Sequence, residues 1–111
     1  MEVTISPYKA IADDTRRAIL DLLRQGQMSA GAIAQQFRRV SRPAISKHLG
    51  VLQRARLVNM RIEGREHIYA LNAEPLREVL EWVQHYNIQW GTQLQSLKDY
   101  LESSSTEEGS C

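Results

Sequence analysis

The chain has 111 residues, of which 42% are hydrophobic and 24% are charged, and its formal net charge is +1. This length and balance predict one globular domain with a single core, and no apolar run is long enough to span a bilayer. The N-terminal residues lack the pattern of a secretory signal, and the single cysteine cannot form an internal disulfide, so we expect a cytoplasmic protein.

The charged residues are segregated along the chain. Residues 1–37 carry four basic and four acidic side chains, residues 38–67 carry eight basic against two acidic, and residues 68–111 carry two basic against seven acidic. The middle segment therefore has a local net charge of +6 and the last segment −5. Such segregation is typical of a domain that meets a polyanion at one end, and the alternative is an ordinary solvated cationic face.

Two helices are predicted near the N-terminus. The Ser-Pro pair at residues 6–7 is the pattern that opens a short helix, which is expected to end near Ala12. Asp13 or Asp14 then caps a helix of about three turns, and Gly26 supplies the left-handed residue that ends it. The apolar stripe of this second helix consists of Ile19, Leu22 and Leu23.

A second pair of helices follows, and the second of them is strongly cationic. Ser29 caps a short helix that is expected to reach Phe37, and Ser41 caps a longer helix within the stretch SRPAISKHLGVLQRARLV. The short link over residues 38–40 makes this pair the outline of a helix-turn-helix. The longer helix has an apolar stripe of Ile45, Leu49 and Leu52, and the same stretch carries the basic residues Arg42, Lys47, Arg54 and Arg56.

After this helix, the hydrophobic residues no longer follow the spacing of an α-helix. Two runs rich in β-forming residues, 57–62 and 67–71, flank Gly64, which is the pattern of a hairpin. A two-stranded hairpin directly after the cationic helix corresponds to the wing of a winged helix-turn-helix. The predicted fold is therefore mostly α with a small β-hairpin: a winged helix-turn-helix with about five helices and a two-stranded wing.

From Pro75 the pattern returns to helix and continues to about Glu102. Apolar residues recur at alternating steps of four and three, which is a heptad seam interrupted only by Asn87. One short domain cannot cover so long a stripe, so we expect the terminal helices to form a homodimer in which Asn87 fixes the register. The expected interface residues are Leu76, Val83, Asn87, Trp90, Leu94 and Leu97. The alternative is that this helix packs on its own core, with a kink at Gly91.

Three motifs occur in order along the chain: IADDTRRAILDLL, SRPAISKHLGVLQRARLV and RIEGREHIYAL. Together they resemble the ArsR family of bacterial and archaeal winged-helix repressors over residues 7–71. The terminal helix, with its two tryptophans, is most similar to the branch that lacks a metal site and includes the SdpR-type autorepressors.

The chain departs from the family pattern at the end of the cationic helix, which is the recognition helix of the family. Arg56 stands there in place of a glycine. A left-handed residue other than glycine costs about 1 kcal/mol. Either the helix ends differently here, or an extra cation near DNA offsets that cost.

Four residues at the start of the cationic helix are predicted to contact DNA. The N-terminal half of this helix enters the major groove in a helix-turn-helix, so Arg42 is expected to bond guanine O6 and N7, which is worth about 1–3 kcal/mol of discrimination. Ser41 and Ser46 are expected on phosphates or base edges, and Lys47 on a phosphate.

Three further residues are predicted to contact DNA, each with a structural alternative. The resemblance places His48 near DNA, but a lone histidine beside an apolar stripe is equally consistent with a partly buried structural residue. Arg61 and Arg65 flank the hairpin tip and are expected to reach phosphates or a minor groove, the alternative being solvated arginines. The motif arginines Arg16 and Arg17 are at least as consistent with bracing the fold.

Metal sensing, which occurs in this family, is not expected here, and neither is catalysis. Thiol-based members carry Cys-x-Cys before the recognition helix, where this chain has GQMSAGAIAQQF. Glu81 and His85 lie four residues apart on the terminal helix but supply two metal ligands at most per chain. No catalytic motif, phosphate loop or dinucleotide fingerprint occurs, so no cofactor is expected.

The sequence therefore predicts a homodimeric, metal-independent repressor of a near-palindromic operator in double-stranded DNA, with its own promoter as the expected target. Residues 1–102 are expected to form the DNA-binding and dimerisation domain, and residues 103–111 a disordered tail. Two alternatives remain: a winged helix that serves as a protein-interaction module, and a repressor released by a small ligand or metal at the dimer interface.

Overall fold

The computed structural model describes residues 4–86 and 99–101 of the chain. The chain divides into two compact units, Met1–Val79 and Leu80–Cys111. The predicted tail and four of the predicted dimer residues lie outside the described residues; these four are Asn87, Trp90, Leu94 and Leu97. Among the helices that the structure describes, none combines the length and the apolar character needed to cross a membrane.

The two N-terminal helices begin at the predicted caps. In α1, Pro7–Ala10, the Ser6 hydroxyl accepts a hydrogen bond from the Lys9 amide. In α2, Asp14–Leu23, the Asp13 carboxylate accepts one from the Arg16 amide at 3.0 Å. Each cap satisfies one of the amides that a helix leaves without an internal partner, which is why these short polar residues begin the helices.

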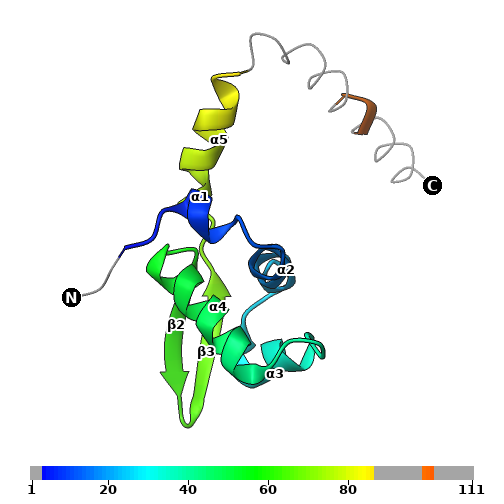
Figure 1. The fold of residues 1–111 in the computed structure, drawn as a ribbon, viewed down its shortest axis with the longest axis vertical. Helices are drawn as coiled ribbons and strands as arrows, with labels where there is room; N and C mark the ends of the chain where they lie inside the picture. Colours follow the sequence, from blue (N-terminus) through cyan, green and yellow to red (C-terminus); the bar gives the residue numbers. More distant parts are fainter. Residues whose placement is uncertain (1–3, 87–98, 102–111) are drawn as a thin grey trace. The chain divides into compact units, whose positions relative to one another are not determined.

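The helix-turn-helix is formed by α3, Ala30–Gln35, and α4, Arg42–Arg54, as predicted. Ser29 caps α3 through the Ala32 amide at 3.1 Å, and Ser41 caps α4 through the Ala44 amide at 3.2 Å. Pro43 lies in the first turn of α4, where its missing amide hydrogen leaves no helical hydrogen bond unmade. Figure 1 shows α3 and α4 next to each other, with the hairpin beside α4 and extending past it.

The predicted hairpin is present, but the sheet has three strands. β2, Val58–Glu63, pairs with β3, Glu66–Leu71, and β3 also pairs with the two-residue β1, Met28–Ser29, in the order β1-β3-β2. The predicted two-stranded wing is confirmed, and β1 adds a third strand to the sheet that was not predicted. Gly64, with φ of 61°, occupies the first position of the two-residue hairpin loop, where a left-handed conformation favours glycine.

One core joins the helices to the sheet. The apolar stripe of α4 packs into it, with Ile45 2%, Leu49 1% and Leu52 0% exposed. The residues before and within β2 continue it, since Leu57 and Val58 are also buried. The remaining buried apolar residues are Ala10, Ile19, Leu20, Leu23, Ile33, Ala55 and Tyr69. The stripe predicted for α4 is confirmed, and it presents the opposite face of α4 to solvent.

The end of α4 resolves the two possibilities left open for Arg56. Arg56 adopts a φ of 62°, which is the left-handed conformation that the family's glycine would take. Its amide bonds the Gln53 carbonyl at 3.0 Å, and the Leu57 amide bonds the Leu52 carbonyl at 3.0 Å, which together form a Schellman cap. The helix thus ends in the ordinary way and retains the cost of a non-glycine residue, about 1 kcal/mol.

Helix α5, Leu76–Gln84, begins where predicted but ends early. The His85 amide bonds the Trp82 carbonyl, and the Tyr86 amide bonds the Val83 carbonyl, so residues 85–86 form a tighter turn. The prediction of one continuous helix to about residue 102 is therefore wrong at Gln84. Residues 99–101 are helical again, and the residues between lie outside those described.

Candidate nucleic-acid interface

The N-terminal half of α4 presents four of the predicted DNA-contact residues on one exposed surface. Ser41, Arg42, Ser46 and Lys47 are all exposed, because the opposite stripe of α4 is held in the core. The guanidinium of Arg42 lies against α3, where a Cβ on Gly31 would stand 3.3 Å from Nη2. A side chain at residue 31 would therefore crowd Arg42.

His48 occupies a different position from these four residues. Its side chain is 21% exposed, and its Nδ1 lies 3.3 Å from Nη1 of Arg16 and 3.9 Å from the Asp13 carboxylate. An arginine can only donate, so Nδ1 of a neutral His48 accepts this hydrogen bond. These contacts connect α4 to the start of α2, which supports the structural alternative for His48; its DNA contact stays a prediction.

The two motif arginines brace the first two helices. Arg16 donates from Nε to the Ala10 carbonyl at 2.6 Å and from Nη2 to the Lys9 carbonyl at 3.2 Å. Arg17 donates to the Ile11 carbonyl at 2.6 Å and pairs with Asp14. The two arginines thereby satisfy the Ala10 and Ile11 carbonyls at the end of α1, whereas the Lys9 carbonyl also accepts from the Ala12 amide.

The cap of α2 makes stability depend on pH in the acid range. The hydrogen bond from the Arg16 amide holds the pKa of Asp13 below its ordinary value of 3.8, and the charge of the Arg16 side chain acts in the same direction. A lowered pKa means that the charged carboxylate contributes stability above pH 3.8, and that this contribution is lost as the pH falls through the folded pKa.

We therefore expect Asp13→Asn, which keeps a capping side chain without the charge, to lower stability at neutral pH by about 0.3–1 kcal/mol. The difference from wild type should shrink as the pH is taken below 3.8. Thermal unfolding followed by circular dichroism from pH 7 downward measures this difference. An offset that stays constant at every pH would show that the charge of Asp13 contributes nothing.

The wing arginines have different surroundings. Arg61 donates from Nη1 to the Gln27 side-chain oxygen at 2.7 Å and pairs with Glu63, so its guanidinium is held by the protein itself. Arg65 lies in the exposed hairpin loop. Of the two, Arg65 is the one whose guanidinium has no hydrogen bond or ion pair within the described residues.

Sequence reasoning left four exposed arginines out of the predicted site. Arg38 and Arg39 lie in the link between α3 and α4. Arg54 and Arg56 line a groove between α4 and β2 together with Lys47. The signal was present in the sequence as local positive charge, but nothing in the sequence showed that the end of α4 faces β2.

Within residues 4–86 and 99–101, no three histidine, cysteine, aspartate or glutamate side chains gather closely enough to hold a metal ion. Glu81 lies on α5 and His85 in the turn after it, and both are exposed.

An exposed cationic helix in a helix-turn-helix, flanked by a hairpin, defines a winged helix-turn-helix DNA-binding protein. A family model described as a helix-turn-helix domain matches residues 11–61. The transcriptional repressor SdpR of Bacillus subtilis (strain 168) is 42% identical over 79 residues, which cover 71% of this chain and 87% of SdpR.

Solved structures are similar over most of the chain. A possible transcriptional regulator for arsenical resistance has a TM-score of 0.70 at 31% identity, covering 84% of this chain and 96% of the other. An ArsR-like transcriptional regulator from Rhodococcus sp. RHA1 has a TM-score of 0.67 at 33% identity, covering 86% and 87%. This chain belongs to the ArsR family of winged helix-turn-helix, DNA-binding transcriptional repressors.

Proposed function

We propose that the protein is a homodimeric repressor that binds a near-palindromic operator, reads it with the N-terminal half of α4, and acts on its own promoter without a metal. The observation that carries this proposal is the exposed surface of Ser41, Arg42, Ser46 and Lys47 on a helix whose other face is buried. In this arrangement Arg42 bonds a guanine edge, the two serines bond base edges or phosphates, and Lys47 neutralises a phosphate.

The wing and the histidine complete the proposed DNA contacts. Arg65, in the hairpin loop, reaches a phosphate or the neighbouring minor groove. Arg61 does the same if DNA replaces its contacts with Gln27 and Glu63. His48 contacts DNA from the partly buried side of α4, where its Nδ1 also bonds Nη1 of Arg16.

The experiment that tests this function is binding to a labelled duplex from the protein's own promoter, titrated against salt and compared with a random duplex of equal length. We expect sequence-selective binding that weakens steeply with salt. Parallel titrations with zinc and with a chelator should give the same affinity. Equal, weak binding to both duplexes would contradict the repressor and favour the protein-interaction alternative.

The dimer is proposed from the apolar character of α5. This helix has no buried residue, and its large apolar residues Leu80 and Trp82 are 56% and 50% exposed. Neighbouring exposed apolar side chains of this size mark a surface that contacts another protein chain. Two of the predicted interface residues, Leu76 and Val83, lie on this helix and are half-buried. A two-fold dimer would place its recognition helices about 34 Å apart, in successive major grooves.

We expect Val83→Glu to convert the dimer to monomer, because the interface would bury an unpaired charge. The dimer dissociation constant should rise roughly 100-fold or more. Sedimentation velocity over a concentration series measures this change, and Glu81→Gln on the exposed side of α5 is the matched control. A Val83→Glu protein that sediments like wild type would place the interface elsewhere.

A further inference from the structure

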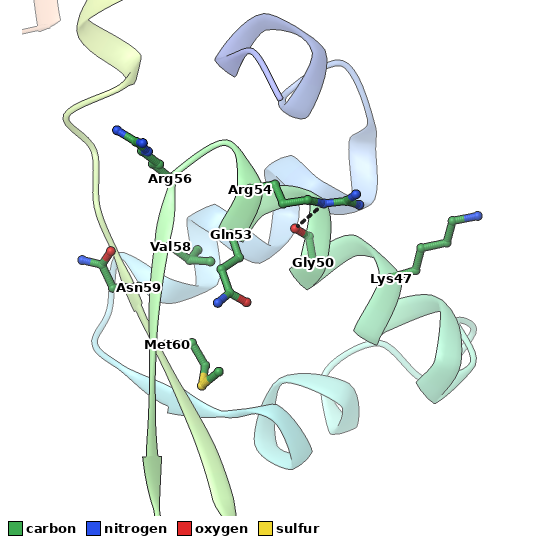
Figure 2. Close-up of a pocket in the computed structure, with 8 residues that line it drawn as sticks. All are labelled: Lys47, Gly50, Gln53, Arg54, Arg56, Val58, Asn59 and Met60. Carbon is green, nitrogen blue, oxygen red and sulfur yellow. Dashed lines mark hydrogen bonds between the residues drawn. The ribbon is translucent and has the colours of Figure 1, made fainter. Parts of the chain in front are cut away.

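A cationic groove lies between the C-terminal half of α4 and strand β2, outside the residues assigned above to base reading. It encloses about 540 Å³. Three of its eight lining residues are cationic, Lys47, Arg54 and Arg56, and none is acidic. Figure 2 shows Arg56 at one end and Lys47 at the other, with Arg54 between them.

The neutral lining is suited to a hydrogen-bonding ligand. The amide side chain of Gln53 lies along the groove, and Val58 and Met60 of β2 contribute its apolar wall, whereas the side chain of Asn59 points to the other side of β2. Val58 is buried, so this wall belongs to the core and is not free to collapse into the groove. The groove is thus open to solvent, with a buried valine in its wall and three cationic residues among those that line it.

The backbone of Arg56 is held rigidly while its side chain points outward. Its amide bonds the Gln53 carbonyl, and its carbonyl accepts from Nδ2 of Asn72 at 2.7 Å. The guanidinium is exposed and has no hydrogen bond or ion pair with the rest of the described chain. Arg56 therefore occupies a strained left-handed position, although its side chain forms no hydrogen bond or ion pair that would stabilise the described part of the fold.

We propose that this groove binds the DNA phosphate backbone, with Arg54 and Arg56 as phosphate contacts beyond those at the start of α4. This inference rests on the proposed function. Lys47 belongs to both surfaces, so the groove continues the face that reads DNA. Lys47 and Arg54 lie two turns apart, about 10 Å along the helix. One strand carries a phosphate about every 3.4 Å along its axis, so the two cations meet different phosphates.

The test measures the affinity of wild type and variants for two duplexes as a function of salt concentration. The duplexes are the promoter duplex and a random duplex of equal length. Arg54→Gln and Arg56→Gln should each weaken binding to both duplexes by a similar factor, about 3- to 10-fold, and reduce the slope of log K against log salt by about 1. Arg56→Lys should restore the slope. Arg24→Gln, which removes the same charge from the exposed end of α2, should leave both measurements unchanged.

A further variant separates binding from folding. Arg56→Gly removes the cation and also relieves the left-handed strain, so its Tm should rise by about 4–8 °C while DNA binding weakens as in Arg56→Gln. A purely structural arginine would not show these opposite effects.

The possible results separate a failure of the groove proposal from a failure of the proposed repressor function. If the slope of log K against log salt is unchanged in both Arg54→Gln and Arg56→Gln, the proposal that the groove binds phosphates is wrong, and the proposed repressor function is unaffected. A loss confined to the promoter duplex would also overturn the groove proposal, because a phosphate contact carries no sequence information. If the wild-type protein binds neither duplex, the function and the groove are both wrong.

Discussion

Reversing the charges of Arg42 and Lys47 together is expected to abolish selective binding to promoter DNA while leaving the fold intact. The Arg42 contact is worth about 1–3 kcal/mol, the Lys47 contact to a phosphate is lost as well, and the two new carboxylates repel phosphates, so affinity should fall roughly 100-fold or more. Both side chains are exposed and neither forms an ion pair with the described part of the chain, so the free energy of unfolding should change little. Fluorescence anisotropy with the labelled duplex measures the loss.

The control carries the same change in net charge at a distance from the recognition helix. Lys9→Glu with Arg24→Glu alters two exposed cations on α1 and at the end of α2, and should bind DNA much closer to wild type. Gel filtration and circular dichroism should show the same oligomer and helix content for all three proteins. If the Arg42 and Lys47 double variant binds like wild type, the assignment of α4 as the recognition helix is wrong.

The largest expected effect on stability comes from Leu52→Ala. Leu52 is 0% exposed, lies in the last turn of α4, and its carbonyl accepts the capping bond from the amide of the equally buried Leu57. Removing a buried leucine side chain costs about 2–5 kcal/mol. A domain of this size has only about 5–15 kcal/mol of stability in total, so the variant should be partly unfolded on mild heating.

Urea unfolding followed by circular dichroism measures this cost, with Ile62→Ala as the control. Ile62 is a large apolar residue of the wing that is 64% exposed, so its truncation should cost less than about 0.5 kcal/mol. A cost below about 1 kcal/mol for Leu52→Ala would mean that α4 is not anchored in the core as the structure indicates. Loss of DNA binding in this variant should track the unfolded fraction.

The capping residues show why much of the fold was predictable. Ser6, Asp13, Ser29 and Ser41 each accept from an amide three residues ahead, so the determining contact lies within a few residues of sequence. The buried stripe of α4 was predictable for a related reason, since its spacing follows the helical period. Gly64 likewise marked the hairpin through a purely local conformational demand.

The third strand was not predictable in this way. β1 has two residues, too few to show a period, and it is extended because Tyr69 and Ile68 of β3 offer it a partner some forty residues further along the chain. The end of α5 at Gln84 was missed because the sequence pattern there is misleading. The heptad spacing of apolar residues continues past Gln84, whereas the backbone of residues 85–86 changes to hydrogen bonds between residues three apart.

The sequence by itself determined where most of the helices start, which residues of α4 are buried, and that positive charge is concentrated between residues 38 and 67. Only the tertiary structure decided that His48 meets Arg16, that Arg56 takes the left-handed conformation, and that Arg54 and Arg56 border a groove with β2. The physical reason is the range of the interactions. Caps and helical stripes depend on neighbours within one or two turns, whereas these three features depend on how separate elements pack around the shared core.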